Sequence, residues 1–243
     1  MESGLFVVTG ASSGIGQAIA QELAKSGSTV LACGRDAEKL KQTKTLPNIH
    51  TFVGDLTHPE TAKEIGKQVE FLKTPLKGLV NNAGAYKPGS FLETSDENWM
   101  EQFNTNLLSA VRLTRQLFPY LKKANPSSVL NISSTLGVRP VPGTSSYSAM
   151  KAAMVNWTEC LALEWAPFQI RVNCLCPGLV DTPIHSFFGL PDDHPNRKSA
   201  HAMQPLKRMG KSSEIAAAAE FLLSSKSAWT TGSVLHVDGG IHL

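Results

Sequence analysis

Short β-rich apolar runs alternate with amphipathic helical stretches from one end of the 243-residue chain to the other. This pattern predicts strands at residues 5–8, 29–33, 50–53, 78–80, 128–132, 170–174 and 233–237. It predicts helices at residues 15–25, from about 36 onward, and at 59–71, 96–123, 146–165 and 213–223. The strands are apolar on both faces, as in a sheet that helices cover on both sides, and alternation repeated this often requires right-handed crossovers between parallel strands. The sequence therefore predicts a doubly wound α/β fold with a parallel sheet.

No Ser- or Gly-rich linker interrupts this series, so we predict that residues 1–243 form a single domain. The one long irregular stretch is 179–206, which contains four prolines. Loops of this length inside a compact domain usually cover a binding site, so we interpret the stretch as a substrate lid. Its apolar and basic side chains are Phe187, Phe188, Leu190, Met203, His185, Arg197 and Lys198.

Composition and charge exclude several classes of protein. Apolar residues make up 42% of the chain and charged residues 18%, which suits a globular protein and is too apolar for a disordered one. The net charge of +3 is mild and the basic residues are scattered, so neither nucleic acid nor an anionic membrane surface is predicted as a partner. No apolar run approaches the roughly 18–20 residues that span a bilayer, and the start lacks the basic region of a signal peptide, so we expect a cytoplasmic protein. The four cysteines form no C-x-x-C pair and no histidine clusters with them, so no metal site is predicted.

A glycine-rich turn joins the first predicted strand to the first predicted helix. Residues 9–16 read Thr-Gly-Ala-Ser-Ser-Gly-Ile-Gly. Such glycines let the backbone turn sharply beside a phosphate, and the N–H groups and dipole of the following helix favour an anion. The same residues spell G-x-S-x-G around Ser12, the nucleophile elbow of serine hydrolases. We disfavour that alternative because the elbow normally follows several strands, whereas only eleven residues precede Ser12.

A Tyr-x-x-x-Lys pair, Tyr147 and Lys151, falls on the helix predicted at 146–165. Residues four apart share a helix face, so the ammonium group is expected beside the phenol. A tyrosine with its ordinary pKa near 10 is a poor acid–base group at neutral pH. Lowering that pKa to about 7 takes roughly 4 kcal/mol of preferential phenolate stabilisation, and a lysine in a poorly solvated cleft is the right kind of group to provide it.

Further motifs stand at the carboxyl ends of predicted strands, where ligands bind to sheets of this kind. An Asn-Asn-Ala-Gly sequence at 81–84 follows the fourth strand, Ser134 closes the fifth, and Pro-Gly at 177–178 follows the sixth. Asn106, Ser134, Tyr147 and Lys151 are separated by 28, 13 and 4 residues. In this order and at these spacings, the motifs resemble those of the short-chain dehydrogenase/reductase family, and the resemblance covers essentially the whole chain.

The resemblance implies a single Rossmann domain with a seven-stranded parallel sheet in the order 3-2-1-4-5-6-7, helices on both faces, and a carbonyl reductase or 3-oxoacyl reductase-like activity. It implies that Ser134 binds the oxygen of a carbonyl or alcohol substrate, and that Tyr147 donates or removes its proton. Lys151, aided by the positive charge of an oxidised nicotinamide, would lower the pKa of Tyr147, and it would also bind the nicotinamide ribose. Asn106 would hold a relay water. The implied cofactor contacts are Gly10, Ser12, Ser13, Gly14, Ile15, Gly16, Arg35, Asp55, Leu56, Asn82, Ala83, Gly84, Tyr147, Lys151, Pro177, Gly178, Val180 and Thr182.

The end of the second predicted strand indicates NADP(H) as the cofactor. In NAD-preferring relatives an acidic residue stands 18 positions after the last glycine of the loop, and here that position is Gly34. Arg35 follows, and its permanent charge suits a 2′-phosphate. We interpret Asp36 as the N-cap of the next helix rather than as a ribose ligand. Because Ser13 is neutral, we expect Arg35 to act largely alone and to give a preference of roughly 10- to 150-fold.

Several alternatives stay open. An NAD-dependent alcohol dehydrogenase working in the oxidative direction, or a nucleotide-binding relative without activity, fits the same motifs. Asn106 and Asp55 could serve only the local structure. An acyl chain, a sugar-derived ketone and a small dicarbonyl are all possible substrates. The family usually forms homotetramers or homodimers, so we expect an oligomer that uses the helices around Asn106 and Tyr147, where Met154 and Trp157 have limited core to reach.

Overall fold

The computed structural model describes residues 4–185 and 188–243. Its strands are β1 (Leu5–Thr9), β2 (Thr29–Gly34), β3 (Ile49–Val53), β4 (Leu76–Asn81), β5 (Ser127–Ile132), β6 (Ile170–Pro177) and β7 (Val234–Val237). Its α-helices are α1 (Gly14–Lys25), α2 (Ala37–Thr43), α3 (Pro59–Phe71), α4 (Asp96–Phe103), α5 (Ser109–Lys123), α6 (Ser145–Trp165), α7 (Pro195–Ala202) and α8 (Ser212–Leu223). The predicted alternation is confirmed, with strand ends that shift by a few residues. Phe187 of the predicted lid lies outside the described residues.

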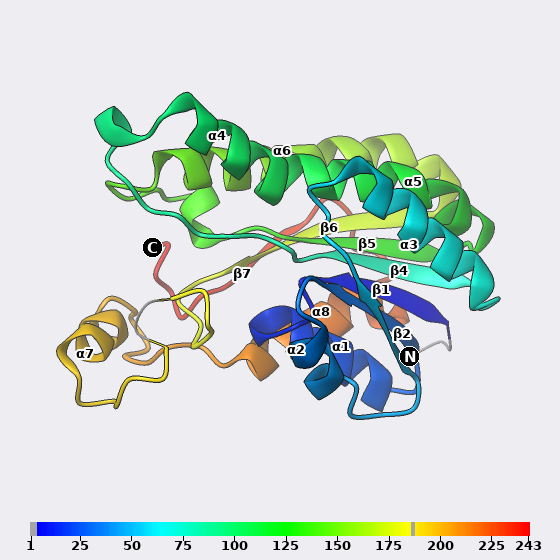
Figure 1. Ribbon diagram of the computed structural model, residues 1–243, viewed down its shortest axis with the longest axis horizontal. Helices are drawn as coiled ribbons and strands as arrows, with labels where there is room; N and C mark the ends of the chain where they lie inside the picture. The colour runs from blue at the N-terminus through cyan, green and yellow to red at the C-terminus, as the bar shows by residue number, and fades with distance from the viewer. Residues whose placement is uncertain (1–3, 186–187) are drawn as a thin grey trace.

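All seven strands form one parallel sheet in the predicted order β3-β2-β1-β4-β5-β6-β7. The order reverses between the neighbours β1 and β4, at the middle of the sheet (Figure 1). Connections leave such a switch point toward opposite faces, which opens a crevice outside the carboxyl ends of the strands. The predicted motifs at 9–16 and 81–84 follow these two strands, so the topology brings them together.

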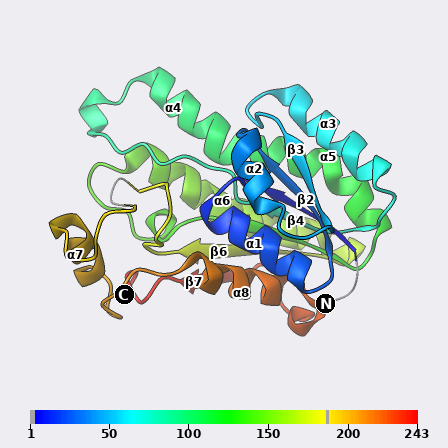
Figure 2. The same cartoon turned by 60° about the horizontal axis from the view of Figure 1, so that its bottom comes forward.

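Helices cover both faces of the sheet (Figures 1 and 2). Phe6 and Val8 of β1 pack in one apolar cluster with α1 and α8, whereas Leu5 and Val7 pack in a second cluster with α3, α5 and α6. Each of these four side chains is at most 2% exposed. Because both faces are buried, the strand is apolar throughout instead of alternating with polar residues.

The helix predicted at 96–123 is interrupted. α4 ends at Phe103, and Asn104–Leu108 form a π-helical turn before α5 begins. In this turn the N–H of Ser109 donates to the carbonyl of Asn104, which inserts one residue into the helical repeat. Such turns often stand at functional sites, and this one carries Asn106, which is fully buried.

The stretch predicted as irregular, 179–206, contains helix α7. Pro195 occupies the first turn of α7, where a missing N–H breaks no hydrogen bond, and His194 caps the helix by accepting from the N–H of Asn196. The proline therefore starts a helix here, although we took it as a sign of a loop. In Figures 1 and 2, α7 lies at the edge of the molecule, away from the helices that cover the sheet.

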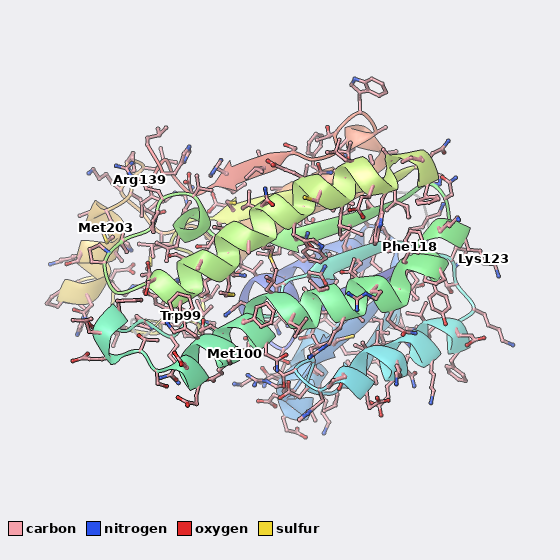
Figure 3. The ribbon with its side chains drawn as sticks, turned by 90° about the horizontal axis from the view of Figure 1, so that it is seen from above. Trp99, Met100, Phe118, Lys123, Arg139 and Met203 are labelled. Carbon is pink, nitrogen blue, oxygen red and sulfur yellow. The ribbon has the colours of Figure 1, made fainter. Side chains whose placement is uncertain are left out.

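Two apolar residues of α6 do not support the predicted interface. Met154, expected to lack core contacts, is 1% exposed within a single chain, and Trp157 packs against the core cluster beneath α6. The exposed apolar side chains of this layer are others, among them Met100 of α4 and Leu163 of α6 (Met100 is labelled in Figure 3). None of the helices formed by the described residues is long and apolar enough to cross a bilayer.

Candidate active site

The turn between β1 and α1 has backbone conformations that need glycine. Gly10 (φ +63°) and Gly14 (φ +57°) lie in the left-handed region. A Cβ atom on Gly16 would collide with the carbonyl oxygen of Gly10, so the first turn of α1 lies directly against the loop. Ser13, the N-cap residue, makes no side-chain hydrogen bond to the helix, which leaves the first N–H groups of α1 without a side-chain acceptor. The loop therefore fits the phosphate cradle that a dinucleotide requires.

Thr9 fixes the two loops at the switch point to one another. Its Oγ1 donates to the carbonyl of Val80 (3.1 Å) and accepts from the N–H groups of Asn82 (2.9 Å) and Ala83 (3.0 Å). The Nδ2 of Asn82 donates back to the carbonyl of Thr9 (2.9 Å). The side chain of Asn82, predicted as a cofactor contact, thus also holds the loop after β4 against the loop after β1.

A cavity of about 660 Å³ opens at the carboxyl ends of β4, β5 and β6, a size typical of small-molecule sites. Many predicted site residues line it: Ile15, Asn82, Gly84, Ser134, Tyr147, Lys151, Pro177, Gly178, Val180 and Thr182. A second cavity of about 260 Å³ lies beside β2 and is lined by Gly10, Ser12, Ser13, Arg35, Asp55, Leu56, Ala83 and, again, Gly84. Because Gly84 lines both cavities, they are adjoining parts of one crevice. Gly14, Gly16 and Asn106 line neither cavity and lie behind these residues.

Tyr147 is 7% exposed on α6. Burial raises the pKa of its phenol above the ordinary value, and a hydrogen bond with Ser134 opposes that rise only in part. Ser134 is itself held in place, since its Oγ accepts from the N–H of Leu136 (3.1 Å). The chain therefore keeps the proton on Tyr147, whereas the sequence led us to expect a lowered pKa.

Lys151 lies close to Tyr147, but in the chain alone it does not lower the pKa of the phenol. Its Nζ lies 5.7 Å from the centroid of the Tyr147 ring, as the spacing predicts, but it donates to the carbonyl of Ile132 (2.8 Å). Lys151 is 3% exposed, and burial lowers the pKa of its ammonium group to about 8. One ammonium that is itself desolvated does not offset the burial of the phenol.

Asn106 joins the π-helical turn to the loop after β4. Its Oδ1 accepts from the N–H of Ala85 (3.0 Å), and its Nδ2 donates to the carbonyl of Ala85 (3.0 Å) and to Oε1 of Gln102 (2.8 Å). A Cβ atom on Gly84 would come within 2.7 Å of Asn106 Oδ1 and 3.6 Å of Lys151 Nζ, so Gly84 lies between the amide and the ammonium. Both amide hydrogens are in use, so the Asn106 side chain could bind a relay water only through the second lone pair of Oδ1.

Ser12 and Ser133 have local contacts that fit structural roles. The Oγ of Ser133 donates to the carbonyl of Lys151 (2.8 Å), so this hydroxyl, next to Ser134 in the chain, is engaged by the main chain of α6. Ser12 lies in the second cavity, and none of the described residues that line this cavity is a histidine. A serine nucleophile needs such a base within hydrogen-bond reach, so the hydrolase alternative has no support here.

Arg35 extends into solvent beside the second cavity. Its side chain is 72% exposed, and Nη1 lies 3.9 Å from Oδ2 of Asp55. The other carboxylate oxygen of Asp55 accepts from the N–H (2.9 Å) and the Oγ1 (2.8 Å) of Thr57, so Asp55 shapes a turn at the strand end as well as lining the cavity. The turn contacts lower the pKa of Asp55 against an opposing effect of burial.

Asp36 caps α2, as predicted, by accepting from the N–H groups of Glu38 (3.1 Å) and Lys39 (3.0 Å). Lys39, one helical turn after Arg35, lines the same cavity, and its Nζ lies 3.5 Å from Oδ2 of Asp36. Sequence reasoning missed this second basic residue. Its place in the first turn of the helix capped by Asp36, close behind Arg35 in the chain, was the available signal.

Tyr86 is a second residue that the sequence analysis did not assign to the site. Its ring lies edge-on to that of Tyr147, with centroids 5.1 Å apart, and 6.4 Å from the ring of His185. All three side chains line the larger cavity. Tyr86 stands two positions after Gly84, so its place directly behind a ligand-binding loop could have identified it.

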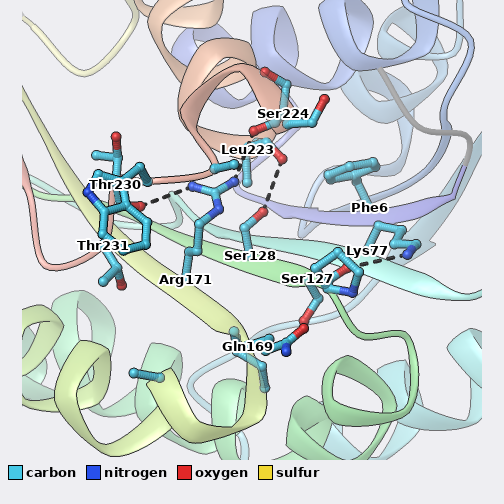
Figure 4. A pocket seen from close by; sticks show the side chains of 16 residues that line it. Phe6, Lys77, Ser127, Ser128, Gln169, Arg171, Leu223, Ser224, Thr230 and Thr231 are labelled. Atoms are coloured by element: carbon cyan, nitrogen blue, oxygen red, sulfur yellow. Dashed lines mark hydrogen bonds between the residues drawn. The ribbon is translucent and has the colours of Figure 1, made fainter.

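A further cavity of about 480 Å³ lies at the amino ends of the strands (Figure 4). The guanidinium of Arg171 donates there to the carbonyls of Leu222 (2.8 Å), Ser224 (3.1 Å) and Thr230 (3.2 Å), which caps the end of α8. These polar groups serve the fold and do not converge on the cavity. Across the described residues, no group of three or more His, Cys, Asp or Glu could hold a metal ion.

A phosphate cradle at the switch point of a parallel sheet and a tyrosine–lysine pair in the adjoining cavity define the class of dinucleotide-dependent oxidoreductases. The comparisons with known proteins agree. A family model described as enoyl-(acyl carrier protein) reductase matches residues 10–242, and the chain belongs to the short-chain dehydrogenase/reductase family.

Individual relatives cover nearly the whole chain. It is 35% identical over 240 residues to Nodulation protein G of Rhizobium sp. (strain N33), and the matched region covers 97% of this chain and 95% of that protein. It is 34% identical over 246 residues to 3-oxoacyl-[acyl-carrier-protein] reductase FabG of Thermotoga maritima, with coverage of 99% and 98%. A crystal structure of an actinorhodin polyketide ketoreductase variant with NADPH has a TM-score of 0.92 and 31% identity over 99% of this chain and 98% of that one.

Proposed function

We propose that this protein reduces the carbonyl group of a small-molecule substrate to a secondary alcohol with NADPH. The observation that carries the proposal is that Ser134, Tyr147 and Lys151 line one cavity with Ile15 and Gly178, which flank the nucleotide loops. Two similar proteins support the direction and the cofactor, because their names describe a 3-oxoacyl reductase and a ketoreductase with NADPH.

Tyr147 would be the proton donor in this reduction. A bound nicotinamide would supply the hydride, so the chain has to orient the carbonyl and deliver a proton. Tyr147 starts from the protonated form, but burial raises the pKa of its phenol, so a positive charge must stabilise the phenolate for the proton to leave. Ser134 would donate to the same carbonyl oxygen while Leu136 fixes its position, and Lys151 would stabilise the phenolate after the proton has left.

The preference for NADP(H) is supported by a steric feature at the end of β2. A Cβ atom on Gly34 would collide with Oγ of Ser12, so an acidic residue at this position, as NAD-preferring relatives carry, would require the Ser12 hydroxyl to move. Arg35 and Lys39 line the same cavity and would face a 2′-phosphate. Asp36 lines this cavity too, but its Oδ1 caps α2 and its Oδ2 lies 3.5 Å from Lys39 Nζ, so we assign it to the helix cap and not to the ribose.

The decisive experiment is a panel of ketones and 3-oxoacyl thioesters, with the loss of NADPH absorbance as the readout. Tyr147→Phe should retain the fold and cut kcat by at least about 10²-fold, the lower end of general acid–base contributions. Because Tyr86 lies against Tyr147, the double variant Tyr86→Phe/Tyr147→Phe tests whether the second phenol takes over. If Tyr147→Phe and the double variant both keep most of the wild-type turnover, the proposed proton donor is wrong.

A further inference from the structure

The larger cavity has an uneven distribution of charge. Among the described residues that line it, Lys151 and Arg139 carry formal positive charges and none is Asp or Glu. Lys151 is buried and bonded to the carbonyl of Ile132. Arg139 is exposed on the loop that follows Ser134, and Figure 3 shows it at the same end of the molecule as Met203, which also lines the cavity. Arg139 is therefore the cation that an entering molecule meets at the rim.

Local bonds hold Arg139 at this rim. Its N–H donates to the carbonyl of Thr135 (2.7 Å), and its Nη1 donates to the carbonyl of His242 in the C-terminal turn (2.9 Å). Asp238, the carboxylate of that turn, accepts from Nδ1 of His242 (2.6 Å) and is 7% exposed. No described carboxylate lies within ion-pair distance of Arg139, so its charge is not neutralised by the chain that surrounds it.

The remaining rim is apolar. Leu136, Val141, Met203 and Ile241 line the cavity together with Arg139. An apolar wall with a single unpaired guanidinium suits a molecule that has a carbon chain and a negatively charged group. A neutral ketone would use only the apolar part of this surface.

We propose that Arg139 is a specificity-determining residue that binds an anionic group of the carbonyl substrate, either a carboxylate or a phosphate. This inference rests on the proposed function, since it concerns the substrate of the same site. The planar guanidinium group binds carboxylates and phosphates with the same geometry. The anion could therefore be the carboxylate of a compact oxo acid or a phosphate on the carrier of a longer thioester.

The test uses two matched pairs of substrates with NADPH. The first pair is an acetylbenzoate anion and its methyl ester. The second pair is acetoacetyl-coenzyme A and the acetoacetyl thioester of N-acetylcysteamine. For each pair, the ratio of kcat/KM values, anionic over neutral, is measured for the wild type, Arg139→Ala, Arg139→Lys and Lys87→Ala. Lys87 is the control, because it pairs with Glu101 (3.1 Å) and does not line the cavity.

We expect the wild type to prefer the anionic member of at least one pair by about 5- to 10-fold, the upper range for an exposed pair with good geometry. Arg139→Ala should bring that ratio close to one, Arg139→Lys should restore part of it, and Lys87→Ala should leave it unchanged. A preference confined to the first pair identifies a carboxylate, and one confined to the second identifies a carrier phosphate. A ratio near one in the wild type, or an equal ratio in Arg139→Ala, overturns the assignment. If no ketone or thioester is reduced at all, the proposed function itself fails.

Discussion

The buried positive charge of Lys151 should lower the free energy of unfolding of the protein at neutral pH. The residue is 3% exposed, and burial lowers the pKa of its ammonium group from 10.5 to about 8. A difference of this size between the unfolded and folded states corresponds to about 3 kcal/mol at neutral pH. Lys151→Met keeps the length of the side chain and removes the charge, but it also removes the hydrogen bond to the Ile132 carbonyl, worth about 1 kcal/mol. We therefore expect Lys151→Met to be more stable than the wild type by about 1–2 kcal/mol at pH 7, although it should lose activity.

The stability difference between Lys151→Met and the wild type should depend on pH. Between pH 8 and 10.5 the unfolded wild type holds a proton on Lys151 that the folded protein has released, so the free energy of unfolding of the wild type rises with pH across this window. The variant has no group that titrates there. Its advantage should be full below pH 8 and should be lost as the pH approaches 10.5, where the missing hydrogen bond leaves it slightly the less stable of the two.

Urea unfolding followed by circular dichroism at pH 7 and pH 10, at one protein concentration, measures both quantities. Lys67→Met, on an exposed position of α3, is the matched control and should change stability by less than about 0.5 kcal/mol at either pH. A Lys151→Met protein that is less stable than the wild type at pH 7 would refute the reasoning. A difference that does not change with pH would refute it as well.

Arg35→Ala should lower the preference for NADPH over NADH in paired fluorescence titrations by about fivefold, less than the sequence suggested because the side chain is 72% exposed. Lys39→Ala should add a comparable factor, Lys41→Ala is the control because it pairs with Glu38 (2.7 Å), and an unchanged ratio in Arg35→Ala would promote Asp36 as the ribose ligand. Arg197→Ala should raise the KM for NADPH several-fold with a smaller effect on kcat, because Arg197 holds α7 to Asp181 through two bonds of 3.0 Å directly before Thr182. Arg197→Lys should rescue it only in part, since an ammonium does not reproduce both bonds, and an unchanged KM would show that α7 does not position this loop. Light scattering should find a tetramer or a dimer at micromolar concentration, and a monomer would contradict that expectation.

The order of strands and helices could be predicted because it depends on patterns a few residues long. Residues 5–8 are all apolar, and a turn with three glycines follows Thr9, so neither signal depends on distant parts of the chain. The sheet order came from the family resemblance, and the site followed because a parallel sheet gathers its carboxyl ends at one edge. The π-helical turn and α7 could not be predicted in the same way. A π turn shifts the helical pattern of apolar residues by a single position, which is too small a change to recognise in the sequence. A proline such as Pro195 is compatible both with a loop and with the first turn of a helix, so its presence does not distinguish the two.

The pKa of Tyr147 could not be predicted from the spacing of residues in the sequence. A separation of four residues places Lys151 near the phenol, and the structure agrees, but a pKa depends on everything that removes water from both groups. For Tyr147 that includes the ring of Tyr86, which lies in a loop 61 positions earlier in the chain. For Lys151 it includes β5, whose Ile132 carbonyl takes its hydrogen bond. Local spacing therefore identifies the pair, whereas the tertiary fold raises the pKa of the phenol and lowers the pKa of the ammonium, so Lys151 alone does not bring the pKa of Tyr147 toward neutral pH.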